Sequence, residues 1–303
     1  MVSNVPAVGV LAEADALTLL RNGKIDIEGR LVDASNTTLR AVITLDGLEA
    51  RCVYKPVRGE RPLWDFPDGT LAGREVAAYL VGAATGWSPV PPTVLRDGPL
   101  GPGACQLWID TVDETDASGD DADASREDSD SSREDSADAD EVDSAERLLG
   151  FVPLGHVPFG WHRIAQAEDE DGKPYVLAHA DDIRLARLAA FDVVINNADR
   201  KGGHILLTPT GDLYGVDHGV SFHLENKLRT ILWGWIGMPI EPETLEVLKR
   251  LRAELDGMLG DSLYDHLMIS EVAEIGVRLD RLIDARSYPE PSRDWPSVPW
   301  PPI

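Results

Sequence analysis

The sequence predicts an α+β fold with two lobes, in which a small antiparallel β-rich lobe precedes a mostly helical one. Residues 24–56 contain three successive segments with the composition typical of strands. Residues from 182 onward instead carry apolar side chains at helical spacing. Between these regions, residues 111–147 contain almost no large apolar side chain, so this segment is expected to separate the two lobes.

In the first lobe, the expected order is strands, one helix and two further strands. Asp46-Gly47 is the strongest hairpin signal, because both residue types tolerate the positive φ angles of a tight two-residue turn. Gly86 is a typical residue to end a helix. The predicted elements are strands over 24–34, 38–47 and 48–56, a helix over 69–86, and strands over 91–96 and 104–110.

The acidic segment 111–147 is predicted to be a disordered insertion. The chain has a formal net charge of −25, and residues 110–147 hold 17 Asp and Glu against 3 Arg, which is −14 and leaves −11 for the rest. The unit SREDS occurs at 125–129 and again at 132–136, as in low-complexity expansions. Such a composition buries too little apolar surface to offset the entropy of ordering. A phosphorylatable serine tract and a mobile flap are the functional alternatives.

Charge and composition also exclude several classes of function. A strongly acidic protein repels polyanions, so neither nucleic-acid binding nor stable association with anionic membranes is expected. No run of 18 apolar residues occurs, and the N-terminal segment lacks the features of a signal peptide, so a cytoplasmic location is expected. Cys52 and Cys105 are the only cysteines and are expected to be buried thiols, because two such residues form neither a disulfide framework nor a zinc site.

The second lobe is expected to begin with a helix that has Asp181 or Asp182 as its N-cap. The Pro- and Trp-rich tail is expected to run extended over the surface, anchored by Trp295 and Trp300. The predicted elements are a helix over 182–196, hairpin strands over 204–207 and 213–217, and helices over 242–259 and 261–284. The predicted domains are a β-rich nucleotide-binding lobe (1–110), the acidic insertion (111–147), a helical catalytic lobe (148–287) and the tail (288–303).

Four residues have the types and positions that phosphoryl transfer needs. That reaction requires a cation for the nucleotide phosphates, acidic ligands for a metal ion and a carboxylate beside the attacking hydroxyl. Asp199 follows a predicted helix in a polar loop, and Asp217 ends a predicted strand before a turn. Lys55 lies at the end of a strand, and Glu75 in the next helix is its natural partner. Asp199 fits the role of the carboxylate that accepts the proton of the attacking hydroxyl, and Asp217 fits the role of metal ligand.

Each of these residues also has an ordinary structural explanation. A lysine at a strand end is usually solvated, and a glutamate in the first turn of a helix favours the helix dipole. Polar residues in a turn usually make hydrogen bonds to the backbone. The order of strand lysine, helix glutamate, loop aspartate, hairpin and strand-end aspartate favours the catalytic interpretation, because that order is much rarer than any single feature.

Two segments of the second lobe resemble a known family. NNADRKGGHILL (196–207) and LYGVDHGVSFH (213–223) are similar to the catalytic loop and metal-binding segment of the phosphoinositide 3-/4-kinase-like branch of the protein-kinase fold, which includes toxin kinases of the HipA type. The chain resembles an actinobacterial group of that branch still more closely. The resemblance covers about residues 30–225 and implies a bilobal kinase-like fold. It implies catalytic roles for Asp199 and Arg200, a metal-binding role for Asp217 and nucleotide-binding roles for Lys55 and its partner Glu75.

The sequence departs from this family at three places. His204 stands where the family usually has a metal-binding Asn, and imidazole suits Mn²⁺ better than Mg²⁺. No GxGxxG motif precedes Lys55, so the candidate phosphate loop is 33–38, and the acidic insertion follows the strand that leads to the adenine site in the family. The further residues expected to contact the nucleotide are Ser35, Asn36, Thr37, Gln106 and Trp108.

These features together predict an ATP-dependent phosphotransferase that uses Mg²⁺ or Mn²⁺. Its acceptor is expected to be a hydroxyl group of a soluble small molecule or a protein. A lipid is not expected, because the chain is acidic and has no basic cluster longer than KRLR at 249–252. A catalytically degenerate pseudokinase that binds nucleotide or a protein partner and a protein AMP-transferase remain as alternatives.

Overall fold

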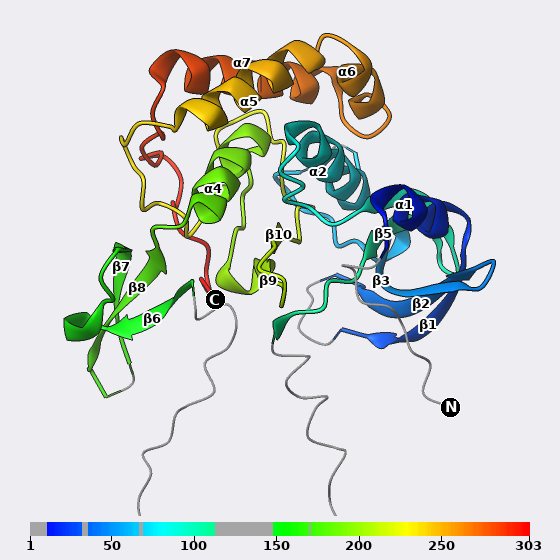
Figure 1. The fold of residues 1–303 in the computed structure, drawn as a ribbon, viewed down its shortest axis with the longest axis horizontal. Coiled ribbons are helices and arrows are strands. Elements are labelled where there is room, and N and C mark those ends of the chain that lie inside the picture. The colour runs from blue at the N-terminus through cyan, green and yellow to red at the C-terminus, as the bar shows by residue number, and fades with distance from the viewer. Residues whose placement is uncertain (1–10, 32–35, 67–68, 113–147, 170) are drawn as a thin grey trace, which may run out of the picture.

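The computed structural model describes residues 11–31, 36–66, 69–112, 148–169 and 171–303. The predicted disordered insertion, apart from its first two residues, and Ser35 lie outside these ranges. The described chain has an α+β fold with two lobes (Figure 1). Every helix in these ranges is too short or too polar to cross a lipid bilayer.

The first lobe is built on a five-stranded antiparallel sheet with the order β1-β2-β3-β5-β4. Asp46 and Gly47 both have positive φ angles, 50° and 85°, which confirms the tight turn between β2 and β3. The predicted strand over 24–34 is shorter in the structure and ends at Arg30. The strands are β1 (Lys24–Arg30), β2 (Leu39–Leu45), β3 (Leu48–Pro56), β4 (Thr93–Gly98) and β5 (Gly101–Leu107).

One face of this sheet is covered by helix α1 (Glu13–Asn22), which the sequence analysis does not predict (Figure 1). Leu19 and Leu20 of α1 are fully buried, and burial of such a side chain contributes about 1.5–3 kcal/mol. They pack in the same core as Cys52 and Cys105. Both cysteines are buried free thiols, as predicted.

Helix α2 (Leu71–Thr85) lies between the sheet and the helices of the second lobe (Figure 1). The Thr70 hydroxyl caps its start by accepting a hydrogen bond from the Gly73 N–H at 2.9 Å. Gly86 ends the helix with a φ of 75°, a conformation that glycine adopts without strain, so the predicted helix end is confirmed. Because both sides of α2 are covered, it carries few exposed residues.

The second lobe contains four α-helices among the described residues. Asp182 is the N-cap of α4, where its carboxylate accepts a hydrogen bond from the Arg184 N–H at 2.8 Å. The predicted helices over 242–259 and 261–284 are wrong at their boundaries, because the first ends at Glu254 and the second is interrupted before Ile269. The helices are α4 (Ile183–Ile195), α5 (Pro242–Glu254), α6 (Met258–Leu263) and α7 (Ile269–Ala285).

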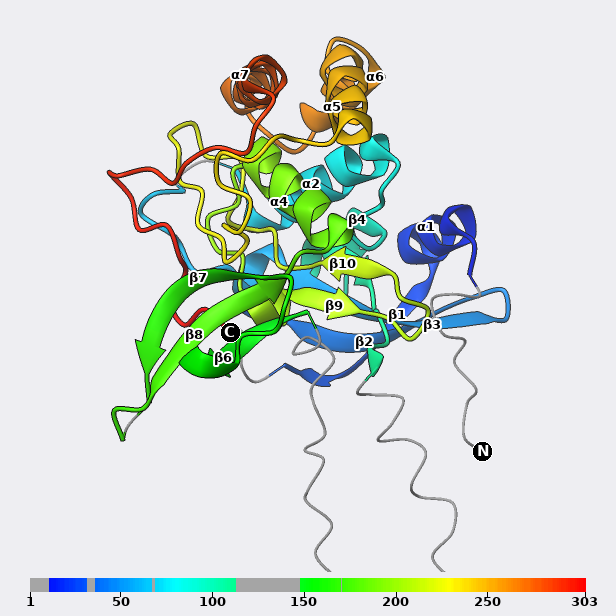
Figure 2. The same ribbon diagram turned by 60° about the vertical axis from the view of Figure 1, so that its left-hand side comes forward.

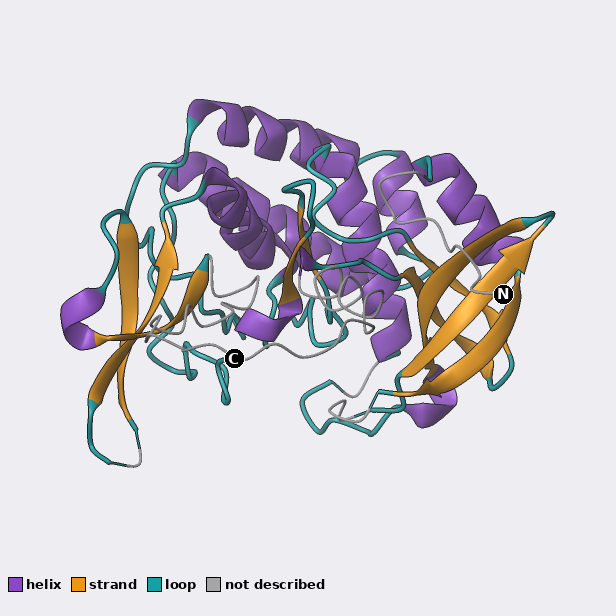
Figure 3. Ribbon diagram, turned by 60° about the horizontal axis from the view of Figure 1, so that its bottom comes forward, coloured by secondary structure: helices purple, strands orange, loops and turns teal. Residues whose placement is uncertain are grey.

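A three-stranded antiparallel sheet that the sequence analysis does not predict forms the opposite end of the molecule from the first sheet (Figures 2 and 3). Its order is β6-β8-β7, and it precedes α4 in the chain. The predicted hairpin, β9 with β10, lies between the two sheets (Figure 2). The strands are β6 (Leu149–Pro153), β7 (Trp161–Glu168), β8 (Pro174–Ala180), β9 (Ile205–Leu207) and β10 (Leu213–Gly215).

His179 of β8 fastens this second sheet to the loop before α5. Its Nε2 accepts a hydrogen bond from the Gly234 N–H at 3.1 Å, and its Nδ1 donates one to the Ala180 carbonyl at 2.9 Å. Its ring lies 4.6 Å from the Trp235 ring. Burial lowers the pKa of His179 to about 4, with His162 acting in the same direction and Asp181 in the opposite one. The neutral imidazole is therefore the form that the fold requires.

This histidine should make the folded protein sensitive to acid. Between pH 6.5 and 4 the unfolded chain binds the proton and the folded chain does not, so the free energy of unfolding should fall as the pH falls through this range. The variant His179→Gln should remove up to one proton from the difference in proton uptake between the unfolded and folded chains. The slope of the free energy of unfolding against pH should then fall by up to about 1.4 kcal/mol per pH unit. Urea denaturation of both proteins at several pH values measures the slope. An unchanged slope would contradict the prediction.

Candidate active site

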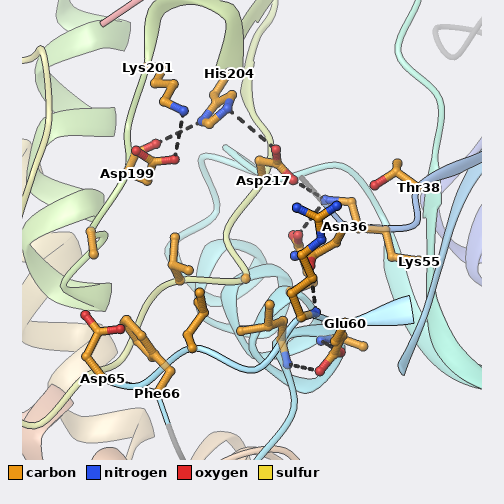
Figure 4. Close-up of a pocket in the computed structure, with 18 of the residues that line it drawn as sticks. Asn36, Thr38, Lys55, Glu60, Asp65, Phe66, Asp199, Lys201, His204 and Asp217 are labelled. Carbon is orange, nitrogen blue, oxygen red and sulfur yellow. Dashed lines mark hydrogen bonds and ion pairs between the residues drawn. The ribbon is translucent and has the colours of Figure 1, made fainter. Parts of the chain in front are cut away.

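The space between the lobes contains two adjoining cavities of about 610 Å³ and 490 Å³. The larger cavity is shown in Figure 4. Both volumes are in the range of small-molecule sites. Four residues line both cavities: Thr38, Lys55, His204 and Asp217. The structure therefore brings together residues from the first sheet and from the hairpin of the second lobe.

Lys55 lies at the centre of this cleft. Its ammonium group is 2.5 Å from Glu75 Oε1 and also donates to Asp217 Oδ1 (Figure 4). Burial lowers the pKa of Lys55, but the two carboxylates more than offset this effect, so its pKa lies well above the ordinary value. Conversely, the charge of Lys55 holds the pKa of Asp217 well below the usual range. Lys55 and Asp217 are therefore both ionised at neutral pH.

Glu75 connects the lysine to the segment after β10. Its second oxygen, Oε2, accepts a hydrogen bond from the His218 N–H at 3.0 Å. Asp217 itself has a φ of 63°, a left-handed conformation that few non-glycine residues adopt. A Cβ at Gly219 would lie 3.2 Å from the Leu71 Cβ, so this segment runs close against α2. The backbone at 217–219 is thus held so that the Asp217 carboxylate projects into the cleft.

Asp199 lies across the cleft, in the loop that follows α4. The loop begins with Asn196, whose left-handed conformation ends the helix. The Asn197 side chain then accepts a hydrogen bond from the Asp199 N–H at 3.0 Å. The Asp199 carboxylate is 3.2 Å from the Lys201 ammonium and 3.7 Å from the Arg229 guanidinium. Two cations thus hold this carboxylate in place at the cavity wall.

His204 lies between the two aspartates (Figure 4). Its Nδ1 is 2.9 Å from the Asp199 carbonyl oxygen, which can only accept, so Nδ1 carries the proton. Burial lowers the pKa of His204 and favours the neutral ring. Its Nε2 lone pair then faces Asp217 Oδ2 at 3.5 Å. Two electron-pair donors that face each other suit a divalent cation between them.

These two donors would supply only part of the coordination shell of a metal ion. Within the described ranges, no group of three or more His, Cys, Asp and Glu side chains is arranged to hold a metal ion. A hard cation at Asp217 and His204 would complete its coordination with water and with phosphate oxygens of a nucleotide, as Mg²⁺ commonly does. The residues present therefore fit a metal that arrives with its substrate.

Arg200, which the sequence predicts as a catalytic residue together with Asp199, does not line the cleft. Its side chain is 0% exposed and forms an ion pair with the buried Asp192 at 3.0 Å. It also donates to the carbonyl groups of His204 and Val216, at 3.2 Å and 3.0 Å, and its Nη2 lies 2.6 Å from Nε2 of His218. Arg200 thus connects the loop of Asp199 to the segment of Asp217 from the protein interior, and it positions both segments without entering the cleft.

The predicted nucleotide contacts are divided between the two cavities. Gln106 and Trp108 line the smaller cavity, next to Lys55. Asn36 and Thr37 line the larger one. The Gln106 side chain is buried and donates to the Thr93 hydroxyl at 2.9 Å, so its orientation is fixed. The structure thus places these four residues around one cleft.

Several residues that line the larger cavity are absent from the sequence prediction. Lys201 follows the predicted catalytic pair directly, and its position was the signal that could have identified it. Arg229 and Trp64 had no such signal, because they lie in irregular loops. Trp295 packs its ring 3.7 Å from the Lys227 ammonium, as predicted for an anchor, whereas Trp300 is 86% exposed and does not anchor the tail.

The fold of this chain is similar to that of a solved kinase structure. No protein-family model matches the chain. The crystal structure of the Golgi casein kinase with Mn/ADP bound is similar over 90% of this chain and 75% of that chain, with a TM-score of 0.51 and 13% sequence identity. The proinflammatory kinase CtkA of Helicobacter pylori gives a TM-score of 0.41, at 10% identity, over 89% of this chain and 94% of that chain. The Golgi casein kinase likeness shows a bilobal protein-kinase-like fold, as the resemblance implies.

A much closer relative is Protein Rv2133c of Mycobacterium tuberculosis (strain ATCC 25618 / H37Rv). The two sequences are 43% identical over 287 residues, which is 95% of each chain. Identity at this level over nearly the whole length indicates a common fold and common ancestry. The chain therefore belongs to the same family as Protein Rv2133c.

Proposed function

We propose that this protein is an ATP-dependent phosphotransferase of the phosphoinositide 3-/4-kinase-like type, which transfers a phosphoryl group to a hydroxyl of a soluble small molecule or a protein. The observation that carries the proposal is the convergence of Lys55, Glu75, Asp199, His204 and Asp217 on one cleft. Lys55 and Asp217 are 162 positions apart and form an ion pair. The kinase-like fold supports the proposal, because phosphoryl transfer in that fold uses these residue types.

In the proposed reaction, the acceptor hydroxyl attacks the γ-phosphorus of ATP. The bond between the γ-phosphorus and the β–γ bridging oxygen breaks, ADP leaves with that electron pair, and the hydroxyl proton passes to the Asp199 carboxylate. The Lys55 ammonium, fixed by Glu75, binds phosphate oxygens. Lys201 and Arg229 beside Asp199 offset the negative charge of the transferring group.

A divalent metal bound by Asp217 and His204 would supply charge neutralisation at the β- and γ-phosphates. The Golgi casein kinase structure was determined with Mn/ADP bound, which is consistent with a nucleotide and a metal in this cleft. Asp217 holds its negative charge at any ordinary pH, because Lys55 depresses its pKa. The chain thus provides a permanently charged oxygen ligand beside a neutral nitrogen ligand.

Labelled ATP tests the proposal. The purified protein is incubated with Mg²⁺ or Mn²⁺, and either γ-labelled or α-labelled ATP, with small hydroxyl compounds and protein acceptors. Transfer of the γ-label, with none of the α-label, is expected. Transfer of the α-label instead would identify an AMP-transferase. Nucleotide binding in a thermal-shift titration with neither transfer nor hydrolysis would identify a pseudokinase.

The variant His204→Asn should change the metal preference. It replaces an imidazole ligand by an amide oxygen, so the ratio of Mg²⁺-dependent to Mn²⁺-dependent turnover should rise by about tenfold, or ~1.4 kcal/mol. Direct Mn²⁺ binding, followed by electron paramagnetic resonance, should weaken in parallel. The matched control is His266→Asn, because His266 is a partly buried histidine outside the cleft. Equal Mn²⁺ affinity of the wild type and His204→Asn would exclude His204 as a ligand.

A further inference from the structure

The acceptor side of the larger cavity has an aromatic rim. Trp64 and Trp300 both line this cavity, and their side chains are 83% and 86% exposed. Trp295 lines the same cavity from the tail. Large apolar side chains that gather at the mouth of a cleft mark a binding surface. Because Asp199 lines the same cavity, this rim lies where an acceptor molecule would enter.

Backbone hydrogen bonds hold the tail part of the rim in place, although the Trp300 ring is exposed. The tail is tied to the second lobe by hydrogen bonds from the Thr230 N–H to the Ser297 carbonyl at 3.0 Å and from the Gly202 N–H to the Pro302 carbonyl at 2.8 Å. These bonds flank Trp300 on both sides. The Lys227 ammonium lies between the indoles of Trp295 and Trp64, at 3.7 Å and 5.4 Å from the ring centroids. The protein therefore holds the Trp300 indole at the cleft mouth without packing its faces.

The charges of this cavity favour a neutral acceptor. Lys55 is paired with Glu75 and Asp217, and Lys201 and Arg229 are paired with Asp199. Among the lining side chains in the described ranges, Glu60, Asp65 and Arg61 have no ion-pair partner. The lining holds five Asp and Glu against four Lys and Arg, so the cavity as a whole offers an anionic acceptor no net positive charge. Carboxylates such as Asp65 instead accept hydrogen bonds from hydroxyl groups.

We propose that the acceptor of this phosphotransferase is a sugar ring, stacked on the Trp300 and Trp64 indoles with its hydroxyl groups toward Asp65 and Asp199. A sugar ring presents apolar C–H faces that pack on indole and a circumference of hydroxyl groups that donate to carboxylates. One of these hydroxyls would be the nucleophile that Asp199 deprotonates. This inference rests on the proposed function, because it names the substrate class of the same site.

A label-transfer assay with a sugar panel tests this inference. The panel contains D-glucose, D-mannose and N-acetyl-D-glucosamine as free sugars, maltotriose as a source of a terminal residue, and a Ser/Thr peptide mixture as the competing acceptor class. The γ-label should move to a member of the sugar set. Transfer to glucose or mannose would identify a free sugar, whereas transfer to maltotriose alone would identify a glycan end.

The variant Trp300→Ala should raise the KM for the accepted sugar by about tenfold, the equivalent of one lost aromatic stacking interaction. The KM for ATP should stay within about twofold. Trp300 is so exposed that its removal should not disturb folding. The control is Phe159→Ala, because Phe159 is 106% exposed and lies outside the cleft. An equal KM for sugar in wild type and Trp300→Ala would overturn the proposed stacking.

The outcomes separate the inference from the proposed function. If the γ-label moves to the peptides and to no sugar, the inference fails and the phosphotransferase proposal stands. If no label moves and ATP is not hydrolysed, both the proposed function and the sugar acceptor are wrong. Quenching of tryptophan fluorescence by the sugars, measured in the wild type and in Trp300→Ala, reports on the stacking without turnover. Absence of quenching by every sugar would also overturn the inference.

Discussion

Replacement of Asp217 by Asn is expected to lower the rate of phosphoryl transfer by about 10³-fold, equivalent to ~4 kcal/mol of lost transition-state stabilisation. The substitution removes the charged ligand of the proposed metal site and one of the two carboxylates that hold Lys55. Asn is the right replacement, because it tolerates the left-handed backbone conformation that residue 217 adopts, with a φ of 63°. Steady-state kinetics with γ-labelled ATP measure the effect.

The matched control is Asp212→Asn in the same hairpin. Asp212 lies in the turn between β9 and β10, where its carboxylate accepts a hydrogen bond from the Thr210 hydroxyl at 2.7 Å, away from the cleft. This variant should keep its activity within about twofold. Both variants should have similar thermal unfolding midpoints. A loss of less than about tenfold in Asp217→Asn would remove Asp217 from the proposed mechanism.

The second large effect is expected on stability. The variant Arg200→Met should lower the free energy of unfolding by about 3–5 kcal/mol, because it leaves the fully buried Asp192 carboxylate without a countercharge. It should also impair catalysis, because the carbonyl groups of His204 and Val216 lose their shared donor. Urea denaturation measures the loss of stability. Steady-state kinetics under conditions in which the variant is folded measure the loss of catalytic activity.

A double-mutant cycle shows whether the ion pair is responsible. The variant Asp192→Leu alone should be destabilised, because it strands the Arg200 guanidinium. The double variant Arg200→Met/Asp192→Leu should recover part of the loss, because replacing both charges removes the uncompensated one. Additive losses would show that the two side chains contribute independently, and a loss below about 1 kcal/mol in Arg200→Met would contradict the buried-pair account.

The parts of the fold that the sequence predicts correctly are those that local chemistry determines. The Asp46-Gly47 turn, the Gly86 helix end and the Asp182 cap each depend on one or two residues and their immediate neighbours. The same is true of the hairpin between Asp199 and Asp217. The helical spacing after 182 is likewise a local pattern that the packed lobe preserves.

The elements that the sequence does not predict depend on contacts between distant residues. Helix α1 has only 10 residues, too few to be stable alone, and forms because Leu19 and Leu20 are buried against the sheet. Strand β7 is partly exposed along its length and shows no clean alternation of buried and exposed side chains. The helix predicted over 242–259 breaks near Gly257, where the chain turns to begin α6.

The candidate site shows the same division. Motifs identify Asp199 and Asp217, but not that Arg200 turns away from the cleft to reach Asp192. The proton position on His204 depends on the Asp199 carbonyl, which only the folded loop brings within 2.9 Å. Arg229 reaches Asp199 from an irregular loop, so no periodicity marks it. Side-chain direction is a tertiary property that residue spacing alone does not determine.

Helix α2 has a mechanical consequence for the way the cleft can open. Arg74 of α2 forms a buried ion pair with Glu271 of α7 at 2.6 Å and donates to the Ser221 carbonyl at 2.6 Å. The inner face of α2, including Ala77 and Val81, is continuous with the core of the second lobe. The helix that carries Glu75 is therefore fastened to the second lobe, whereas Lys55 belongs to the five-stranded sheet. Any movement of that sheet relative to the second lobe that widens the cleft would have to break the ion pair between Lys55 and Glu75.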